Sequence, residues 1–87
     1  MTLEEIRQEI DQVDDAIVTL LEQRMNLVDQ VVALKKLTGT AVLDSKREGV
    51  IFTRVADKVE NKDYKETVVA TFSDILKRSR EFQNKNV

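Results

Sequence analysis

The sequence contains no cysteine, no histidine and no proline, and it has only two glycines among its 87 residues. Without cysteine, disulfides, thiol nucleophiles and thiolate metal sites are excluded. Without histidine, the chain lacks the residue that carries out Ser–His hydrolysis and imidazole acid–base chemistry near neutral pH. If the protein is an enzyme, its chemistry therefore depends on arginine, lysine, carboxylates, amides and hydroxyls.

Long apolar runs and an excess of positive charge are also missing. No stretch approaches the roughly 20 apolar residues of a membrane span, and the charged N-terminus MTLEEIRQE differs from a secretory signal. We therefore expect a cytoplasmic protein with no membrane contact. The net charge of -2 argues against a nucleic-acid partner, because binding to phosphates requires a basic surface. The length allows one domain, residues 1–87.

Apolar residues alternate at three- and four-residue spacings through the first part of the chain. This heptad seam consists of Leu3, Ile6, Ile10, Val13, Ile17, Leu20, Leu27, Val31 and Leu34. Thr2 and Glu5 have the spacing of a capping box, and Gly39 is suited to end the helix. A helix from about Thr2 to Leu37 would be roughly 50 Å long. Because that is too long to pack only on its own chain, the pattern predicts a partner helix.

Two shorter helices are expected after a loop at residues 40–43. The first is capped by Asp44 or Ser45. Its apolar face consists of Ile51, Val55, Val59 and Phe52. The last helix runs from about Lys62 to Asn84, and we expect residues 85–87 to fray. The predicted fold class is all-α, with three helices per chain, of which the N-terminal one is very long.

Two cations interrupt the apolar pattern of the long helix. Arg24 fills a seam position between Leu20 and Leu27, where a single basic residue commonly fixes the register or oligomeric state of a coiled coil. Lys35 is near the helix end, where a lysine often extends along the helix to solvent. Eleven residues nevertheless separate them by only about 20° around the helix. Both cations can therefore face the same space.

Polar residues also lie on the inward faces of the two shorter helices. Asp44, Arg47 and Glu48 share one face through three- and four-residue spacings, which by themselves are compatible with a helix cap and a local ion pair. Ser79 and Gln83 continue the apolar line of the last helix. By themselves they are compatible with a small core residue and a helix end.

Taken together, these polar residues indicate a binding cavity. Seven of them are predicted to face the core between the three helices: Arg24, Lys35, Asp44, Arg47, Glu48, Ser79 and Gln83. Buried charge is costly unless it is paired or engaged by a ligand. A cavity with three cations, an acceptor such as Glu48 and two neutral polar groups suits a small dianion that carries hydroxyl groups.

The order of these motifs resembles the all-helical chorismate mutases over nearly the whole chain. The matching stretches are IRQEIDQVDDAIVTLLEQRMNLV, then Lys35, then LDSKRE, and finally Ser79 and Gln83 within SREFQ. The spacings from Arg7 through Arg24 and Lys35 to the LDSKRE motif follow the family pattern without a gap. The first motif alone resembles many amphipathic helices, whereas the combination in this order is specific.

The resemblance implies an isomerase that rearranges chorismate to prephenate in phenylalanine and tyrosine biosynthesis, without a metal or cofactor. It also implies an intertwined homodimer in which the long helices cross and each chain lends Arg7 to its partner's site. Helix geometry agrees with this arrangement. Arg7 and Lys35 are roughly 42 Å apart along a straight helix, so they cannot both hold one small ligand from the same chain.

The resemblance further implies a role for each polar residue. Arg24 and the partner's Arg7 would hold the two carboxylates, and Glu48 would bind the ring hydroxyl. Lys35 and Gln83 would donate to the ether oxygen, where negative charge develops in the transition state. The catalytic candidates are thus Lys35, Gln83 and Arg24, and the substrate-binding candidates are Arg7, Arg24, Lys35, Asp44, Arg47, Glu48, Ser79 and Gln83.

Two alternatives remain open at the level of sequence. The first is an isochorismate–pyruvate lyase, or a related enzyme acting on aminodeoxychorismate, since these share the fold and much of the pocket. The second is a non-catalytic helical dimerisation module with Arg24 as its register device. That module predicts that Arg24→Leu stabilises the dimer and that no small dianion raises the melting temperature, whereas an enzyme is stabilised by a transition-state-like diacid.

Overall fold

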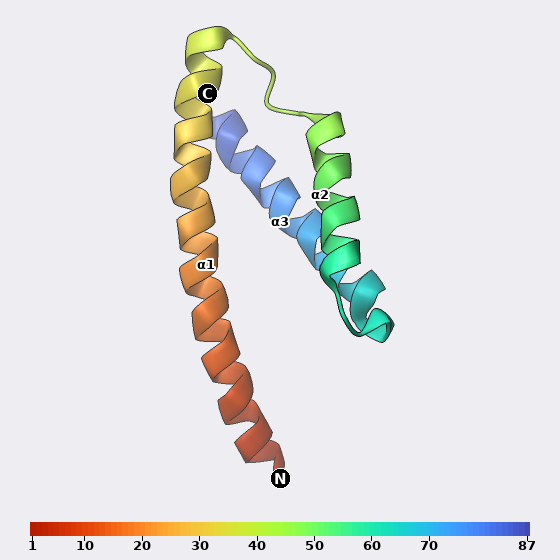
Figure 1. The fold of residues 1–87 in the computed structure, drawn as a ribbon. Helices are drawn as coiled ribbons and strands as arrows, with labels where there is room; N and C mark the ends of the chain where they lie inside the picture. Colours follow the sequence, from red (N-terminus) through yellow and green to blue (C-terminus); the bar gives the residue numbers. More distant parts are fainter.

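The computed structural model describes all 87 residues and is entirely helical (Figure 1). It contains α1 (Leu3–Thr38), α2 (Ser45–Lys58), the short 3-10 helix η1 (Lys62–Tyr64) and α3 (Lys65–Asn86). α3 packs against both α1 and α2, whereas no Cα atom of α1 lies within 8 Å of one in α2. The predicted all-α class with one long and two shorter helices is therefore confirmed.

Both ends of α1 are fixed by the residues that the sequence indicated. The Glu5 amide donates to Thr2 Oγ1 at 3.2 Å, and the Thr2 amide donates back to the Glu5 carboxylate at 3.4 Å, which completes the capping box. At the other end, Gly39 adopts a φ of 70° and its amide donates to the Lys35 carbonyl. A left-handed residue at this point suits glycine, which has no Cβ to clash.

Hydrogen bonds also cap the start of α2 and the end of α3. Asp44 caps α2, with its carboxylate accepting from the Arg47 amide at 2.9 Å. The prediction that residues 85–87 fray is wrong for the first two of them, because α3 continues to Asn86. The Asn86 side chain donates to the Phe82 carbonyl at 2.8 Å, and the Val87 amide donates to the Gln83 carbonyl at 2.8 Å. These bonds satisfy carbonyls that a helix end otherwise leaves free.

The core is small and lies mainly between α2 and α3. Ile51, Val55 and Leu76 form its centre, and the partly buried side chains packed against it are Phe52, Val68, Val69 and Phe72. Only 7 of the 87 residues are buried, and α1 contributes two of them, Val28 and Val32. These two valines lie outside the α2–α3 cluster, in the C-terminal half of α1, and α1 packs against α3.

The N-terminal half of α1 extends away from the rest of the chain (Figure 1), and every residue from 1 to 23 is exposed. The radius of gyration is 15.9 Å, against about 12 Å for a compact chain of this length. The accessible surface is 7035 Å², which exceeds that of a compact monomer of this mass by roughly 1,800 Å². The exposed large apolar side chains of α1 are Leu3, Ile6, Ile10, Val13, Ile17, Val18, Leu20, Leu21, Leu27, Val31, Leu34 and Leu37. No helix is long and apolar enough to span a membrane.

Candidate functional site

A cavity of about 350 Å³ lies where the C-terminal half of α1, the start of α2 and the C-terminal half of α3 meet. Its volume falls at the lower end of the range for small-molecule sites, and it is partly open to solvent. The polar residues that line it are Arg24, Lys35, Asp44, Arg47, Glu48, Ser79, Arg80 and Gln83, and the apolar ones are Leu27, Val28, Val31, Val42, Ile51 and Leu76. All seven polar residues that the sequence placed on core-facing sides thus line one cavity.

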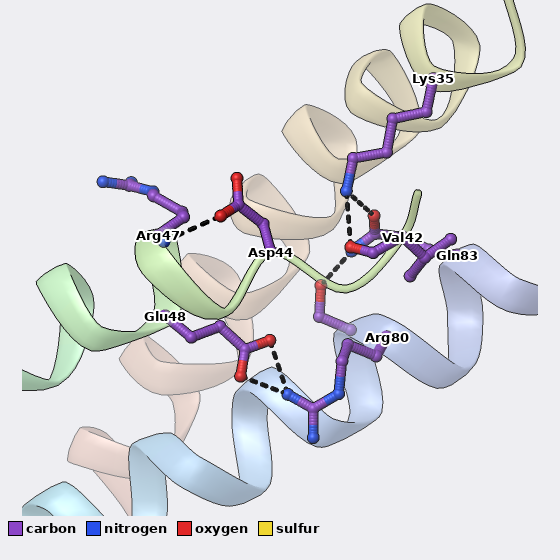
Figure 2. A network of polar contacts seen from close by, with 8 residues as sticks. Lys35, Val42, Asp44, Arg47, Glu48, Arg80 and Gln83 are labelled. Carbon is purple, nitrogen blue, oxygen red and sulfur yellow. Dashed lines mark hydrogen bonds and ion pairs between the residues drawn. The ribbon is translucent and has the colours of Figure 1, made fainter. Parts of the chain in front are cut away.

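A chain of hydrogen bonds fixes the polar end of the cavity (Figure 2). Lys35 Nζ donates to the Val42 carbonyl at 2.8 Å and to Gln83 Oε1 at 3.1 Å. Gln83 Nε2 in turn donates to Ser79 Oγ at 3.2 Å. An ammonium group has three N–H donors and an amide nitrogen has two. One proton of Lys35 and one of Gln83 therefore remain for a ligand, as does the Ser79 hydroxyl proton.

Because Ser79 and Gln83 are buried, their hydrogen bonds determine how their side chains are oriented. Ser79 and Gln83 are the only two polar side chains among the buried residues. They lie one turn apart on the side of α3 that faces α1, and no buried side-chain polar atom in the structure lacks a partner. A buried amide that accepts from Lys35 must turn its nitrogen toward Ser79. The orientation of the Gln83 amide follows from both contacts.

An ion pair between α2 and α3 borders the same cavity. Arg80 Nη1 lies 2.6 Å from both carboxylate oxygens of Glu48, and the two side chains are only 30% and 19% exposed. Figure 2 shows the two groups facing each other, whereas the Arg47 guanidinium points away from them. Asp44 and Arg47 are exposed, so they lie at the rim of the cavity rather than in its buried part.

Arg24, like Lys35, is a half-buried cation that α1 contributes to this cavity. Burial, together with the positive charges of Arg47 and Arg54, lowers the pKa of Arg24 from its ordinary value. The guanidinium remains protonated at neutral pH, because the ordinary pKa of arginine is so high. Burial is the larger cause of this shift, and the two neighbouring guanidinium groups add positive charge around Arg24, where an anion would be stabilised.

The charges of the lining contrast with those of the whole chain. Four cations and two carboxylates line the cavity, so its net charge is +2, whereas the chain carries -2. A cavity with one sign of charge raises the local concentration of ligands with the opposite sign. The cavity therefore favours a small anion, and its charge matches that of a dianion.

Arg80 is the polar lining residue that the sequence reasoning missed. Its position, four residues after Leu76 and three before Gln83, places it on the inward face of α3. That spacing is a usable signal that Arg80 faces inward. The signal is obscured because Arg80 stands in SREFQ next to a glutamate and beside a run of exposed charges, so it resembles one more surface residue. Its pairing with Glu48, 32 residues earlier, depends on how α2 packs against α3.

Arg7 is the one predicted site residue that this chain does not bring to the cavity. It is exposed on the second turn of α1, in the half that packs against nothing in its own chain. The cavity lining from α1 begins at Arg24. Along a helix, Arg7 and Arg24 are separated by roughly 25 Å. Within one chain, Arg7 and the cavity are therefore far apart.

Comparison with known proteins gives two matches, and both carry the name chorismate mutase. The family model described as "Chorismate mutase type II" matches residues 6–84. A curated protein named "Chorismate mutase" from Methanocaldococcus jannaschii is 28% identical over 93 residues, which covers 97% of this chain and 94% of that protein. No solved structure matches the chain at a significant level.

Proposed function

This chain belongs to the type II chorismate mutase family, its activity is the rearrangement of chorismate to prephenate, and we propose that the cavity between α1, α2 and α3 is where it occurs. The proposal includes a single domain over residues 1–87, since the family match spans 6–84. Chorismate is a dianion with a ring hydroxyl, and its ether bond breaks as a carbon–carbon bond forms. The reaction needs no nucleophile, so the chain's task is to bind, orient and stabilise charge.

The observation that carries this proposal is the pair of donors at Lys35 and Gln83. Because two of the three Lys35 protons are used by the Val42 carbonyl and Gln83, the direction of the third is set by the protein. Gln83 likewise keeps one free N–H beside it. Both groups would donate to the ether oxygen as negative charge builds there. Donors that are already oriented stabilise the transition state more than the ground state, which raises the rate.

The remaining cavity residues would bind the carboxylates and the hydroxyl. Arg24, in its positive surroundings, would hold one carboxylate, with the Ser79 hydroxyl and Arg47 close by. Glu48, with the backbone near Asp44, would accept the hydrogen bond of the ring hydroxyl. Holding the substrate at these points selects the compact, chair-like conformer in which the reacting carbons lie close together.

We further propose that two chains form an intertwined homodimer. The excess surface of roughly 1,800 Å² per chain would give an interface in the size class of obligate dimers. The exposed seam of α1 is apolar along its length. An antiparallel partner helix would cover this seam and bring the partner's Arg7 to the open side of the cavity, where it would hold the second carboxylate.

Substitution within the seam tests the dimer. Ile10→Lys places an ammonium group in the apolar stripe, and we expect the dimer dissociation constant to rise about 100-fold or more, because unpaired buried charge is costly. Sedimentation equilibrium measures this constant. The matched control is Gln12→Lys, which adds the same charge on the opposite side of α1. Equal dimer stability in the two variants would contradict a dimer built on the seam.

The donor role of Gln83 predicts a distinctive pH dependence. An amide donates at any pH, so wild-type kcat should stay nearly constant through neutral pH. In Gln83→Glu, only the protonated carboxyl can donate to the ether oxygen, so kcat should fall as pH rises through the pKa of that carboxyl. Rates measured from acid to neutral pH check this. A Gln83→Glu profile parallel to that of the wild type would argue against donation by this residue.

The activity itself is tested by mixing the purified protein with chorismate and following the loss of chorismate absorbance. The product is identified as prephenate by chromatography. A parallel incubation with isochorismate, analysed for salicylate and pyruvate, separates the mutase from a lyase. Formation of salicylate with no turnover of chorismate would reject the proposed reaction while leaving the cavity as the site.

A further inference from the structure

Arg80 lies in the cavity but has no part in the roles given above. It lines the cavity, and its ion pair with Glu48 is the only one in the structure that links two helices. The pair is largely shielded from solvent, and both carboxylate oxygens lie 2.6 Å from Arg80 Nη1. Surface ion pairs are weak, whereas shielded pairs with short hydrogen bonds are stronger.

Glu48 without this partner would be poorly suited to its proposed task. A glutamate side chain loses considerable rotamer freedom when it is held in one position. Its negative charge would also repel a dianion entering the same cavity. Arg80 removes both problems, because its guanidinium holds the carboxylate in place and balances its charge. An ionised carboxylate offers roughly four acceptor sites, so a hydroxyl can still bind beside the arginine.

We propose that Arg80 is a positioning residue that fixes and neutralises Glu48, so that Glu48 accepts the substrate hydroxyl without repelling the dianion. This inference rests on the proposed function of the cavity. Arg80 acts through Glu48 on groups that do not change charge during the reaction. Its effect is therefore on binding, shared by the ground state and the transition state, and it should appear in KM rather than in kcat.

Arg80→Met tests this with chorismate as the probe. We expect KM to rise roughly tenfold to a hundredfold, as for loss of one partner of a shielded charged hydrogen bond, while kcat changes less than about threefold. The matched control is Arg78→Met, which removes an arginine of the same helix whose partner, Glu81, is exposed. It should leave both constants unchanged. A wild-type KM in Arg80→Met would overturn the inference.

A double-mutant cycle distinguishes positioning from a general structural role. In the Glu48→Gln background, Arg80→Met should change KM less than about threefold further, because the group on which it acts has been replaced. An equal loss in both backgrounds would overturn the inference. If Arg80→Met does not fold, as judged by its melting curve, the same cycle is run with Arg80→Lys. Its rise in KM should be smaller and should likewise disappear in the Glu48→Gln background.

The test of the cavity as the active site is separate from the test of Arg80. The wild-type protein is assayed first, and absence of prephenate would reject the proposed function. Prephenate formation by the wild type, together with unaltered kinetics in Arg80→Met, would reject only the role of Arg80.

Discussion

Lys35→Ala should lower kcat by about 100- to 1,000-fold or more, as for the loss of a single preoriented donor to developing negative charge. The ammonium group contributes mainly in the transition state, when the ether oxygen gains charge, so KM should change much less than kcat. The rate of chorismate loss under saturating substrate measures the effect. Lys36→Ala is the matched control, because Lys36 is the next residue of α1 and is exposed.

A structural cause must be separated from a catalytic one, since Lys35 also bonds to the Val42 carbonyl. The melting temperature and helical circular dichroism of Lys35→Ala show whether the protein still folds without this bond to the loop between α1 and α2. A folded Lys35→Ala variant that retains more than about a tenth of wild-type kcat would refute the donor role.

Two inactive variants should restore activity when their chains are mixed. Arg7→Ala damages the site of the partner chain, whereas Lys35→Ala damages the site of its own chain. A mixed dimer of the two has one site with both defects and one intact site. If chains reassort at random in a two-fold symmetric dimer, half of the dimers are mixed and about a quarter of wild-type activity returns. The rate of prephenate formation after joint refolding measures this recovery.

The control for this experiment mixes Arg24→Ala with Lys35→Ala. Both substitutions lie in the same chain's share of the site, so every site in every dimer carries one defect and no activity should return. Recovery with the first pair but not with the second would require Arg7 to act across the dimer. Failure of both pairs, with mixed dimers demonstrated by mass, would place Arg7 outside the site.

Much of the fold could be predicted because local signals were strong and agreed with one another. The Thr2–Glu5 capping box, Gly39 and Asp44 mark helix ends through contacts within four residues, and all three act as expected. The end of α3 could not be predicted in the same way. The side-chain bond from Asn86 to the Phe82 carbonyl extends the helix beyond Asn84, and asparagine is otherwise a weak helix former.

The candidate site could be predicted to the extent that helix faces determine it. Seven polar residues shared inward faces at regular spacings, and they line one cavity. Helical spacing alone did not predict which group each polar residue bonds to. The pairing of Glu48 with Arg80 joins two helices, and the bond from Lys35 to the Val42 carbonyl joins a helix to a loop. Such contacts depend on how the elements pack.

The bond from Lys35 to the main chain of Val42 has a consequence for how the loop at residues 39–44 can vary. Because the acceptor is a backbone oxygen, replacing the side chain at position 42 leaves it in place. Inserting or deleting one residue between Gly39 and Asp44 would instead shift the carbonyl and redirect the ammonium group. The residues between Gly39 and Asp44 should therefore tolerate changes of residue type far better than changes of length.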